Sequence, residues 1–247
     1  MKAFPPSVAA QIKTGFSSDQ ICLLHCSPGQ LAAERLRSWQ ALLSAEERGK
    51  AVRFRYYSDY AAYICAHALL RAAIAVILDI TIDAVEIRPG QNGKPELARA
   101  PVAVPLRFNL SHTEDMVLIA LTRGIEVGVD VERLDRTVES DFITHCCSPR
   151  EGREMLLLSA RQRVKRFIRL WTLKEALLKA SGQGITRKMK EICCNLDPPR
   201  LLQPGPLPGN PADWRLWRGH FPPTFVWSLA VRNAPRVDPV LIPAIQA

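Results

Sequence analysis

The stretch from Gly128 to Arg136, GVDVERLDR, places two carboxylates, Asp130 and Glu132, on either side of Val131. It follows an apolar run typical of strands, DMVLIALTRGIEVGV. Side chains two residues apart share one face of a strand, so we expect Asp130 and Glu132 to lie side by side. Their repulsion must be offset by solvent or by a cation. The strand alone leaves two interpretations open: an edge strand with a solvated outer face, or an ion site.

A second stretch, FIRLWTLKEALLKASG at residues 167–182, repeats apolar residues at helical spacing and ends on a glycine suited to a helix C-cap. Glu175 and Lys179 are one turn apart, and on a solvated surface such a pair contributes only about 0.2–0.5 kcal/mol. Trp171 and several leucines indicate that part of the helix is buried instead. Asp130, Glu132 and Glu175 together would make an oxygen-rich site of the kind that Mg²⁺ prefers.

The rest of the chain alternates helical and strand-like segments. Residues 61–78 form the most apolar segment, which we interpret as a buried helix beginning near Ser58 or Asp59 rather than as a membrane span. Strands are predicted in the segments AVEIRPG, LRFNLSHTEDMVLIALTRGIEVGVDVE, MKEICCNL, DWRLWRG and FVWSLAV.

One internal similarity bears on the fold. HALLRAA, which starts at His67, resembles EALLKAS, which starts at Glu175. The match is short enough to arise by chance, because Ala and Leu are favoured in helices. If it is a true repeat, Arg71 and Lys179 are equivalent. We then expect an α+β fold of two similar halves related by a pseudo-twofold axis. Each half would pack a small, mainly antiparallel sheet with a long helix, and the active site would lie in the cleft between them.

The domain prediction is an N-terminal half, residues 1–108, and a C-terminal half, residues 109–247, whose segment from Pro198 is rich in proline. A formal charge of +9 favours an anionic partner. The seven cysteines show no zinc-type spacing, which indicates reduced thiols in a cytoplasmic protein. The start of the chain lacks the pattern of a signal peptide.

Several basic and polar residues form a second candidate group. Lys94 lies on the turn NGKPEL, and Ser111 and His112 lie near the end of a predicted strand, FNLSH. Each would be unremarkable alone, as a solvated lysine or a hydrogen-bonded turn histidine. A Ser-His hydrolase is disfavoured, because adjacent strand residues point apart and no G-x-S-x-G motif is present.

Four motifs, GKPEL, FNLSHTED, GVDVER and WTLKEALLKASGQGI, in this order and at these separations, resemble the 4′-phosphopantetheinyl transferases. The resemblance covers roughly Ser44 to Ile185. Length and apparent duplication resemble the large, monomeric, surfactin-type (Sfp-like) group rather than the short trimeric enzymes.

The resemblance implies an enzyme that uses coenzyme A and Mg²⁺, with Mn²⁺ as a substitute ion. Such enzymes transfer the phosphopantetheine arm to a serine of an apo acyl or peptidyl carrier protein and release 3′,5′-ADP. Carrier proteins of fatty acid, polyketide, nonribosomal peptide and siderophore synthesis are modified in this way. Their acidic surface suits a +9 enzyme. We expect no nucleic-acid or membrane partner.

The resemblance also implies residue roles. Asp130, Glu132 and Glu175 match the metal ligands, and the candidate base is Glu175 or a Mg²⁺-bound water that it orients. Lys179 matches the lysine that contacts the pyrophosphate. The implied coenzyme A contacts are Lys50, Lys94, Ser111 and His112, with His112 near the 3′-phosphate. Glu151 matches an acidic residue tied to activity.

Two positions depart from the family pattern. Ala62 stands where an arginine is usual, and Glu47 occupies another position that is often basic. Either Arg48, Arg53 or Arg55 is expected to supply the missing charge, or coenzyme A is expected to bind less tightly. Two less favoured functions are a catalytically inert homologue that binds coenzyme A or carrier protein, and a basic nucleic-acid-binding module. The second is weakened because the basic residues do not gather into an interaction motif.

Overall fold

The computed structural model describes residues 4–18, 20–99, 105–184, 187–234 and 238–244. Its backbone forms two units, each with its own hydrophobic core. The first unit comprises Met1–Pro89, Pro95–Gly124 and Arg236–Ala247, and the second comprises Gly90–Lys94 and Ile125–Pro235. Both contain helices and mainly antiparallel strands, so the predicted α+β class is confirmed.

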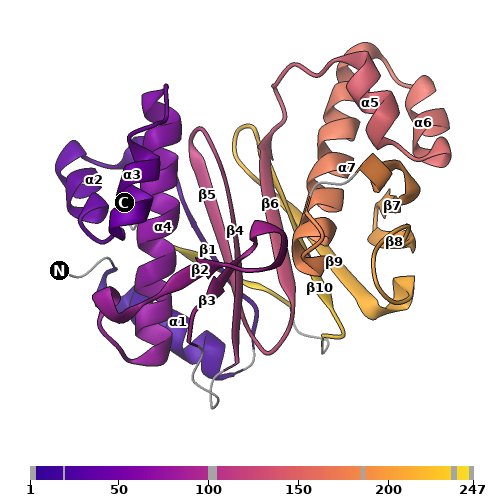
Figure 1. Cartoon of the computed structure of the whole chain (residues 1–247). Helices are drawn as coiled ribbons and strands as arrows, with labels where there is room; N and C mark the ends of the chain where they lie inside the picture. Colours follow the sequence, from indigo (N-terminus) through magenta and orange to yellow (C-terminus); the bar gives the residue numbers. More distant parts are fainter. Residues whose placement is uncertain (1–3, 19, 100–104, 185–186, 235–237, 245–247) are drawn as a thin grey trace. The chain divides into compact units, whose positions relative to one another are not determined.

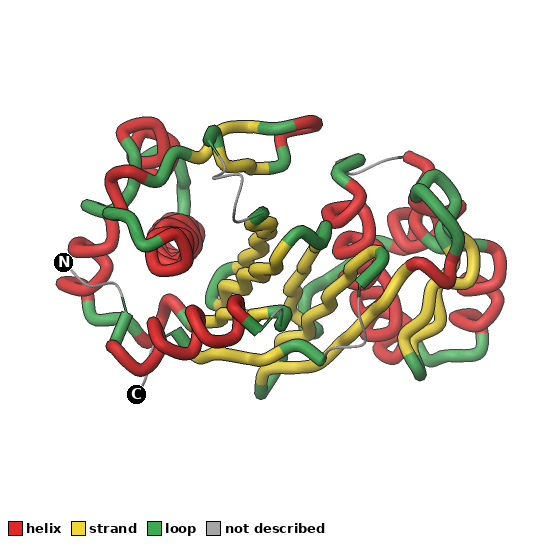
Figure 2. The backbone as a smooth tube through the Cα atoms, turned by 90° about the horizontal axis from the view of Figure 1, so that it is seen from below, coloured by secondary structure: helices red, strands yellow, loops and turns green. Residues whose placement is uncertain are grey.

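The sheet of the first unit has the strand order β11-β1-β5-β4 (Figure 1). The β1–β11 pair is parallel, and the other two pairs are antiparallel. The strands of this unit are β1 (Cys22–Cys26), β4 (Leu106–Thr113), β5 (Met116–Arg123) and β11 (Val240–Pro243), with a separate ribbon of β2 (Ile87–Pro89) and β3 (Pro95–Leu97) that Figure 2 shows as two neighbouring strands. Its helices are α1 (Pro6–Ser17), α2 (Ala33–Gln40), α3 (Ala45–Ala51) and α4 (Tyr57–Leu78), with short 3-10 turns η1 (Pro28–Gln30) and η2 (Ile82–Ala84).

Helix α4 forms the centre of the first core. It is long and apolar enough to cross a membrane by length and composition, but 78% of its most apolar window is buried within the unit. This is the predicted buried helix. It begins earlier than predicted: Tyr56 is the extended N-cap residue, and Asp59 lies in the first turn. No side chain caps this end, so the expected Ser58 or Asp59 cap is absent.

The sheet of the second unit has the order β6-β10-β9, and both pairs are antiparallel. Its strands are β6 (Val127–Arg133), β9 (Trp214–Phe221) and β10 (Phe225–Arg232), with a ribbon of β7 (Cys193–Leu196) and β8 (Pro199–Gln203). Its helices are α5 (Ser140–Cys146), α6 (Pro149–Leu156) and α7 (Ala160–Ser181), with 3-10 turns η3 (Gln91–Gly93), η4 (Arg187–Glu191) and η5 (Pro211–Asp213). The predicted strands at GVDVER, MKEICCNL, DWRLWRG and FVWSLAV are therefore present.

Helix α7 has well-defined ends. Ser159 and Gln162 form a reciprocal capping box at its start. Gly182 ends it in the left-handed region, with φ 71°, which glycine adopts without strain. Ile185, the last residue of the matching motif, lies outside the described residues.

Gly128 determines how closely α7 approaches β6, the neighbour it packs along in Figure 1. A Cβ atom at this position would overlap the carbonyl oxygen of Ala176 and the backbone nitrogen of Ala180. The strand and the helix therefore meet backbone to backbone. Asp130 and Glu132 share the Gly128 face of the strand, so this contact brings them next to α7.

The predicted boundary between residues 108 and 109 differs from these units. It falls inside β4, which pairs with β5 along its whole length and so holds residues up to Gly124 in the first unit. The chain also returns to the first unit near its end, because β11 pairs with β1. The predicted pseudo-twofold relation stays a prediction.

We predict that Gly128→Ala lowers the free energy of unfolding by about 1–3 kcal/mol, the usual cost of overpacking a dense interior. The added methyl group meets backbone, which cannot rotate away as a side chain can. Chemical denaturation monitored by circular dichroism measures the change.

Gly152→Ala is the matched control. Gly152 lies within α6, and a Cβ there meets nothing within 4 Å. Alanine should stabilise this helix by about 0.5–1 kcal/mol. Equal stability of Gly128→Ala and the parent protein would contradict the close packing at β6.

Candidate active site

Three of the predicted site residues meet on β6 and α7 of the second unit. Asp130 is 5% exposed, and its Oδ1 accepts a hydrogen bond from Lys179 Nζ at 2.7 Å. Glu175 lies one turn before Lys179 on the same helix and is also 5% exposed. Burial of two carboxylates next to one lysine is costly, which is typical of functional sites.

Glu132, two residues beyond Asp130, is partly buried and forms an ion pair with Arg136 at 2.7 Å. Burial raises the pKa of its carboxyl, the bond from Arg136 lowers it, and the charge of Asp130 raises it further. The repulsion expected between Asp130 and Glu132 is therefore present, but each carboxylate has a basic partner.

Within the described part of the chain, Glu175 forms no ion pair of this kind. Burial raises its pKa to about 7, and the negative charges of Asp130 and Glu132 add to the effect, which Lys179 partly opposes. Its Oε1 is buried and has no hydrogen-bond partner among the described residues. A buried carboxylate oxygen without a donor costs free energy unless a proton or a cation binds it.

The carboxylates do not form a preassembled metal centre. Among the described residues, no group of three or more His, Cys, Asp or Glu side chains is arranged to hold an ion. The physical reason lies in the ion pairs, because Lys179 and Arg136 occupy oxygens of Asp130 and Glu132. The donor set nevertheless suits a hard cation, since it consists of carboxylates and Glu175 Oε1 is available.

Lys94 and Asn92 lie at the C-terminal end of the same helix, just beyond Lys179, and Lys94 is predicted to contact coenzyme A. Lys94 Nζ donates to Glu126 at 2.9 Å and to the carbonyl oxygens of Val127 and Ala180 at 3.4 Å. Asn92 Nδ2 donates to the carbonyl oxygen of Gly182 at 2.8 Å. Both side chains thus satisfy carbonyls at the C-terminus of α7, as helix ends require.

Glu151, predicted as a catalytic residue, is 1% exposed, and its carboxylate is fully engaged. Lys174 Nζ donates to it at 2.6 Å, the Cys194 amide at 2.9 Å and the Ser148 amide at 2.8 Å. Through these bonds it joins α6, α7 and β7, and its predicted catalytic role stays a prediction.

The first unit repeats this local motif. Ser44 and Glu47 form a capping box on α3, as Ser148 and Glu151 do on α6. Glu47 accepts from Arg71 of α4 at 2.6 Å and lies 3.1 Å from His67, and these bonds outweigh burial to lower its pKa to about 2. Glu47, which occupies a position that is often basic in the family, therefore forms an ion pair within the first unit. The S-x-x-E spacing, which is typical of a capping box, could have predicted from sequence that both glutamates cap a helix.

The other predicted contacts lie in the first unit. Ser111 and His112 are adjacent on β4, with Ser111 buried and the His112 ring 6.3 Å from that of Tyr63, edge to face. Lys50 lies in the last turn of α3, where it forms an exposed ion pair with Glu46 at 2.8 Å. Arg53 follows α3 and is exposed. The structure thus places these predicted contacts on β4 and around the end of α3.

Two family models match the chain. Residues 126–230 match the 4′-phosphopantetheinyl transferase superfamily, and residues 32–123 match the N-terminal part of a 4′-phosphopantetheinyl transferase. These segments contain β6 and α7 in the first case and α3, α4, β4 and β5 in the second.

Named relatives agree with the family models. The chain is 33% identical over 175 residues to the 4′-phosphopantetheinyl transferase HetI of Nostoc sp., covering 70% of this chain and 73% of that protein. It is 24% identical over 166 residues to the 4′-phosphopantetheinyl transferase Sfp of Bacillus subtilis, covering 67% and 72%. The chain therefore belongs to the 4′-phosphopantetheinyl transferase superfamily, and within it to the Sfp-like group.

We predict that Lys174→Met lowers the free energy of unfolding by about 3–5 kcal/mol, because it leaves the Glu151 carboxylate buried without its cation. Adding Glu151→Gln should recover part of the loss. Denaturation curves of the single and double variants measure both effects.

Arg150→Ala serves as the comparison, since it breaks an exposed pair with Glu154 and should cost less than about 1 kcal/mol. A Lys174→Met variant no less stable than Arg150→Ala would show that the buried pair does not hold α6 and α7 together.

Proposed function

We propose that this protein transfers the 4′-phosphopantetheine arm of coenzyme A to a serine hydroxyl of an apo carrier protein. The serine Oγ–phosphorus bond forms, the phosphorus–oxygen bond of the pyrophosphate breaks, and 3′,5′-ADP leaves. Membership of the family supports the reaction class. The single observation that carries the proposal is the buried group of Asp130, Glu175 and Lys179 on β6 and α7.

Glu175 is the proposed general base. A serine hydroxyl is a weak nucleophile, and its proton must be removed as it attacks. With its pKa raised to about 7, the Glu175 carboxylate is a stronger base than an ordinary glutamate and is still partly ionised at neutral pH. Oε1, which has no hydrogen-bond donor among the described residues, would accept the proton directly, or would orient a water that accepts it when this oxygen holds the ion.

Lys179 is proposed to stabilise the leaving nucleotide. Its ammonium group is already held in place by Asp130, so little reorganisation is needed when a pyrophosphate oxygen approaches. Asp130, Glu132 and Glu175 are the proposed ligands of Mg²⁺, or of Mn²⁺ in its place. When bound, that ion would neutralise charge on the pyrophosphate.

The proposed coenzyme A contacts are Ser111, His112, Lys50, Arg53 and Lys94. Ser111 and His112 hold fixed positions on β4, whereas Lys50 and Arg53 are exposed and lie outside the core. Lys94 would have to exchange Glu126 for a phosphate oxygen. Since Glu47 is neutralised by Arg71, it does not oppose a phosphate near α3.

The charge and the cysteines support the remaining parts of the proposal. A formal charge of +9 suits a carrier protein with an acidic surface. All seven cysteines are buried and free, as expected for a cytoplasmic enzyme. We propose that the enzyme acts as a monomer. An inert homologue is the second candidate; the presence of Asp130, Glu132, Glu175 and Lys179 favours the enzyme.

We predict that the protein, incubated with coenzyme A, Mg²⁺ and an apo acyl or peptidyl carrier domain, adds one phosphopantetheine to the carrier. Intact-mass spectrometry of the carrier measures the product directly. Glu175→Ala should abolish the mass gain, because it removes both the proposed base and a proposed ligand.

Glu139→Ala is the control, since this exposed glutamate precedes α5 and its side chain makes no capping bond. It should keep the parent rate. No mass gain on carriers of several types would favour the inert homologue, and full activity of Glu175→Ala would remove Glu175 from the chemistry.

A further inference from the structure

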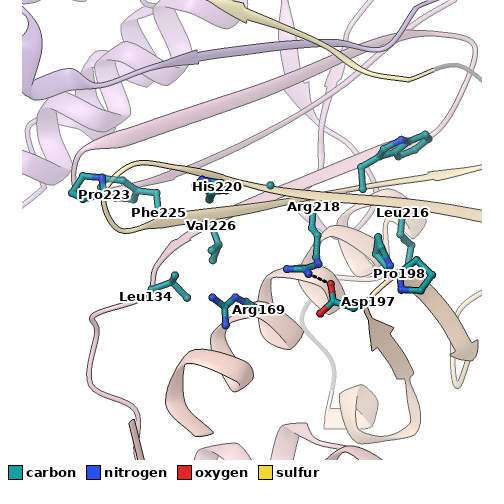
Figure 3. Close-up of a pocket in the computed structure, with 13 residues that line it drawn as sticks. Leu134, Arg169, Asp197, Pro198, Leu216, Arg218, His220, Pro223, Phe225 and Val226 are labelled. Carbon is teal, nitrogen blue, oxygen red and sulfur yellow. Dashed lines mark hydrogen bonds and ion pairs between the residues drawn. The ribbon is translucent and has the colours of Figure 1, made fainter. Parts of the chain in front are cut away.

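A cavity of about 820 Å³ lies in the second unit (Figure 3) and adjoins the end of β6, where Glu132 pairs with the lining residue Val226. Its walls come from the β9–β10 hairpin, from Leu134 just after β6, from Arg169 on α7 and from the turn at Asp197 between β7 and β8. An adjoining cavity of about 420 Å³ shares Arg169, Asp197 and Arg218 with it. None of the predicted catalytic, metal or coenzyme A residues lines either cavity.

The wall formed by the sheet is apolar. Leu216 and Val226, 8% and 5% exposed, belong to the core of the unit and also line the cavity. Leu134 extends the surface at Val226 (Figure 3). A small molecule could therefore place hydrocarbon here and gain free energy by removing apolar surface from water.

The opposite side carries unbalanced positive charge. Arg218 donates through Nε to the carbonyl oxygen of Leu196 at 2.8 Å and forms an ion pair with Asp197. Arg169, from α7, makes no hydrogen bond or close ion pair with any residue that the structure describes. Two guanidinium groups thus face one carboxylate, and Lys165 adds charge along the adjoining cavity, whereas Arg166 there is paired with Glu154.

Arg169 is partly buried, so its isolation is unfavourable. Burial lowers its pKa, and the nearby Arg218 lowers it further, while Asp197 opposes the fall only in part. An anion bound between the two guanidinium groups would relieve both unfavourable effects. The planar fork of an arginine matches the geometry of a carboxylate or a phosphate, to which it donates two parallel hydrogen bonds.

We propose that this cavity is a binding site for a small organic anion with a carboxylate or phosphate head and a short apolar body. The head binds Arg169 and Arg218, and the body packs on Val226 and Leu134, which lie beside Arg169 in Figure 3. Its volume lies within the range of small-molecule sites, about 300–1,000 Å³. None of the residues proposed for transfer lines the cavity, so the binding test has a readout that does not depend on transferase activity.

Isothermal titration calorimetry on the full chain tests the proposal with three probes of equal hydrocarbon length: octanoate, octyl phosphate and octan-1-ol. At least one anion should bind at least ten times more tightly than the alcohol, and the tighter of the two anions identifies the head group. Equal binding of the alcohol, or no binding of either anion at millimolar concentration, would overturn the proposal.

Variants locate the site. Arg169→Gln should weaken anion binding at least about tenfold, the loss expected when a charge-assisted hydrogen bond is removed. Arg161→Gln, an exposed arginine on the same helix and outside both cavities, is the matched control and should bind as the parent does. Unchanged affinity of Arg169→Gln would place the anion elsewhere.

A measurement on the unmutated protein removes dependence on how the variant folds. In ¹⁵N spectra, the Nε–H resonances of Arg169 and Arg218 should shift as the anion is added, while that of Arg161 stays in place. Saturable binding without shifts at Arg169 and Arg218 would contradict the assignment.

Discussion

The contact between α7 and β6 at Gly128 is the constraint on which the candidate site depends. Without a side chain at this position, the helix backbone lies directly on the strand, opposite Ala176 and Ala180. Glu175 and Lys179 each precede one of these alanines, so the same contact carries them to the face that bears Asp130. Asp130 on the strand and Glu175 and Lys179 on the helix are far apart in the sequence, but this contact brings them into one charged group.

The second unit contains two buried glutamates, one whose carboxylate is fully hydrogen-bonded and one whose carboxylate is not. Glu151 receives three donors, including the ammonium of Lys174, and is fully satisfied. Glu175, which follows Lys174 on α7, keeps a buried oxygen without a donor among the described residues and a pKa raised to about 7. A satisfied buried charge joins elements of the fold, whereas an unsatisfied one retains free energy that a ligand or a proton can recover.

Periodicity revealed most of the fold in advance, because α4, α7 and the longer strands carry strong apolar patterns. The pairing of Asp130 with Glu132 and its connection to Glu175 were also readable from spacing and motif. The contacts that Lys94 and Glu151 make within the fold were not, since both depend on where a distant helix end or helix face lies. The boundary near residue 108 was missed for the same reason: β4 and β5 belong with β1 and β11 through long-range pairing that leaves no local pattern.

The central claim is that Glu175 is held among like charges and is completed by a cation. The most direct measurement is the pKa of the Glu175 carboxyl group, followed by ¹³C NMR of its Cδ during a pH titration with and without Mg²⁺. We predict a pKa of about 7 without metal. We also expect this pKa to fall by at least about one unit when Mg²⁺ is added, because a metal ligand must lose its proton. A pKa near the ordinary value of 4.5 that does not respond to Mg²⁺ would contradict this claim.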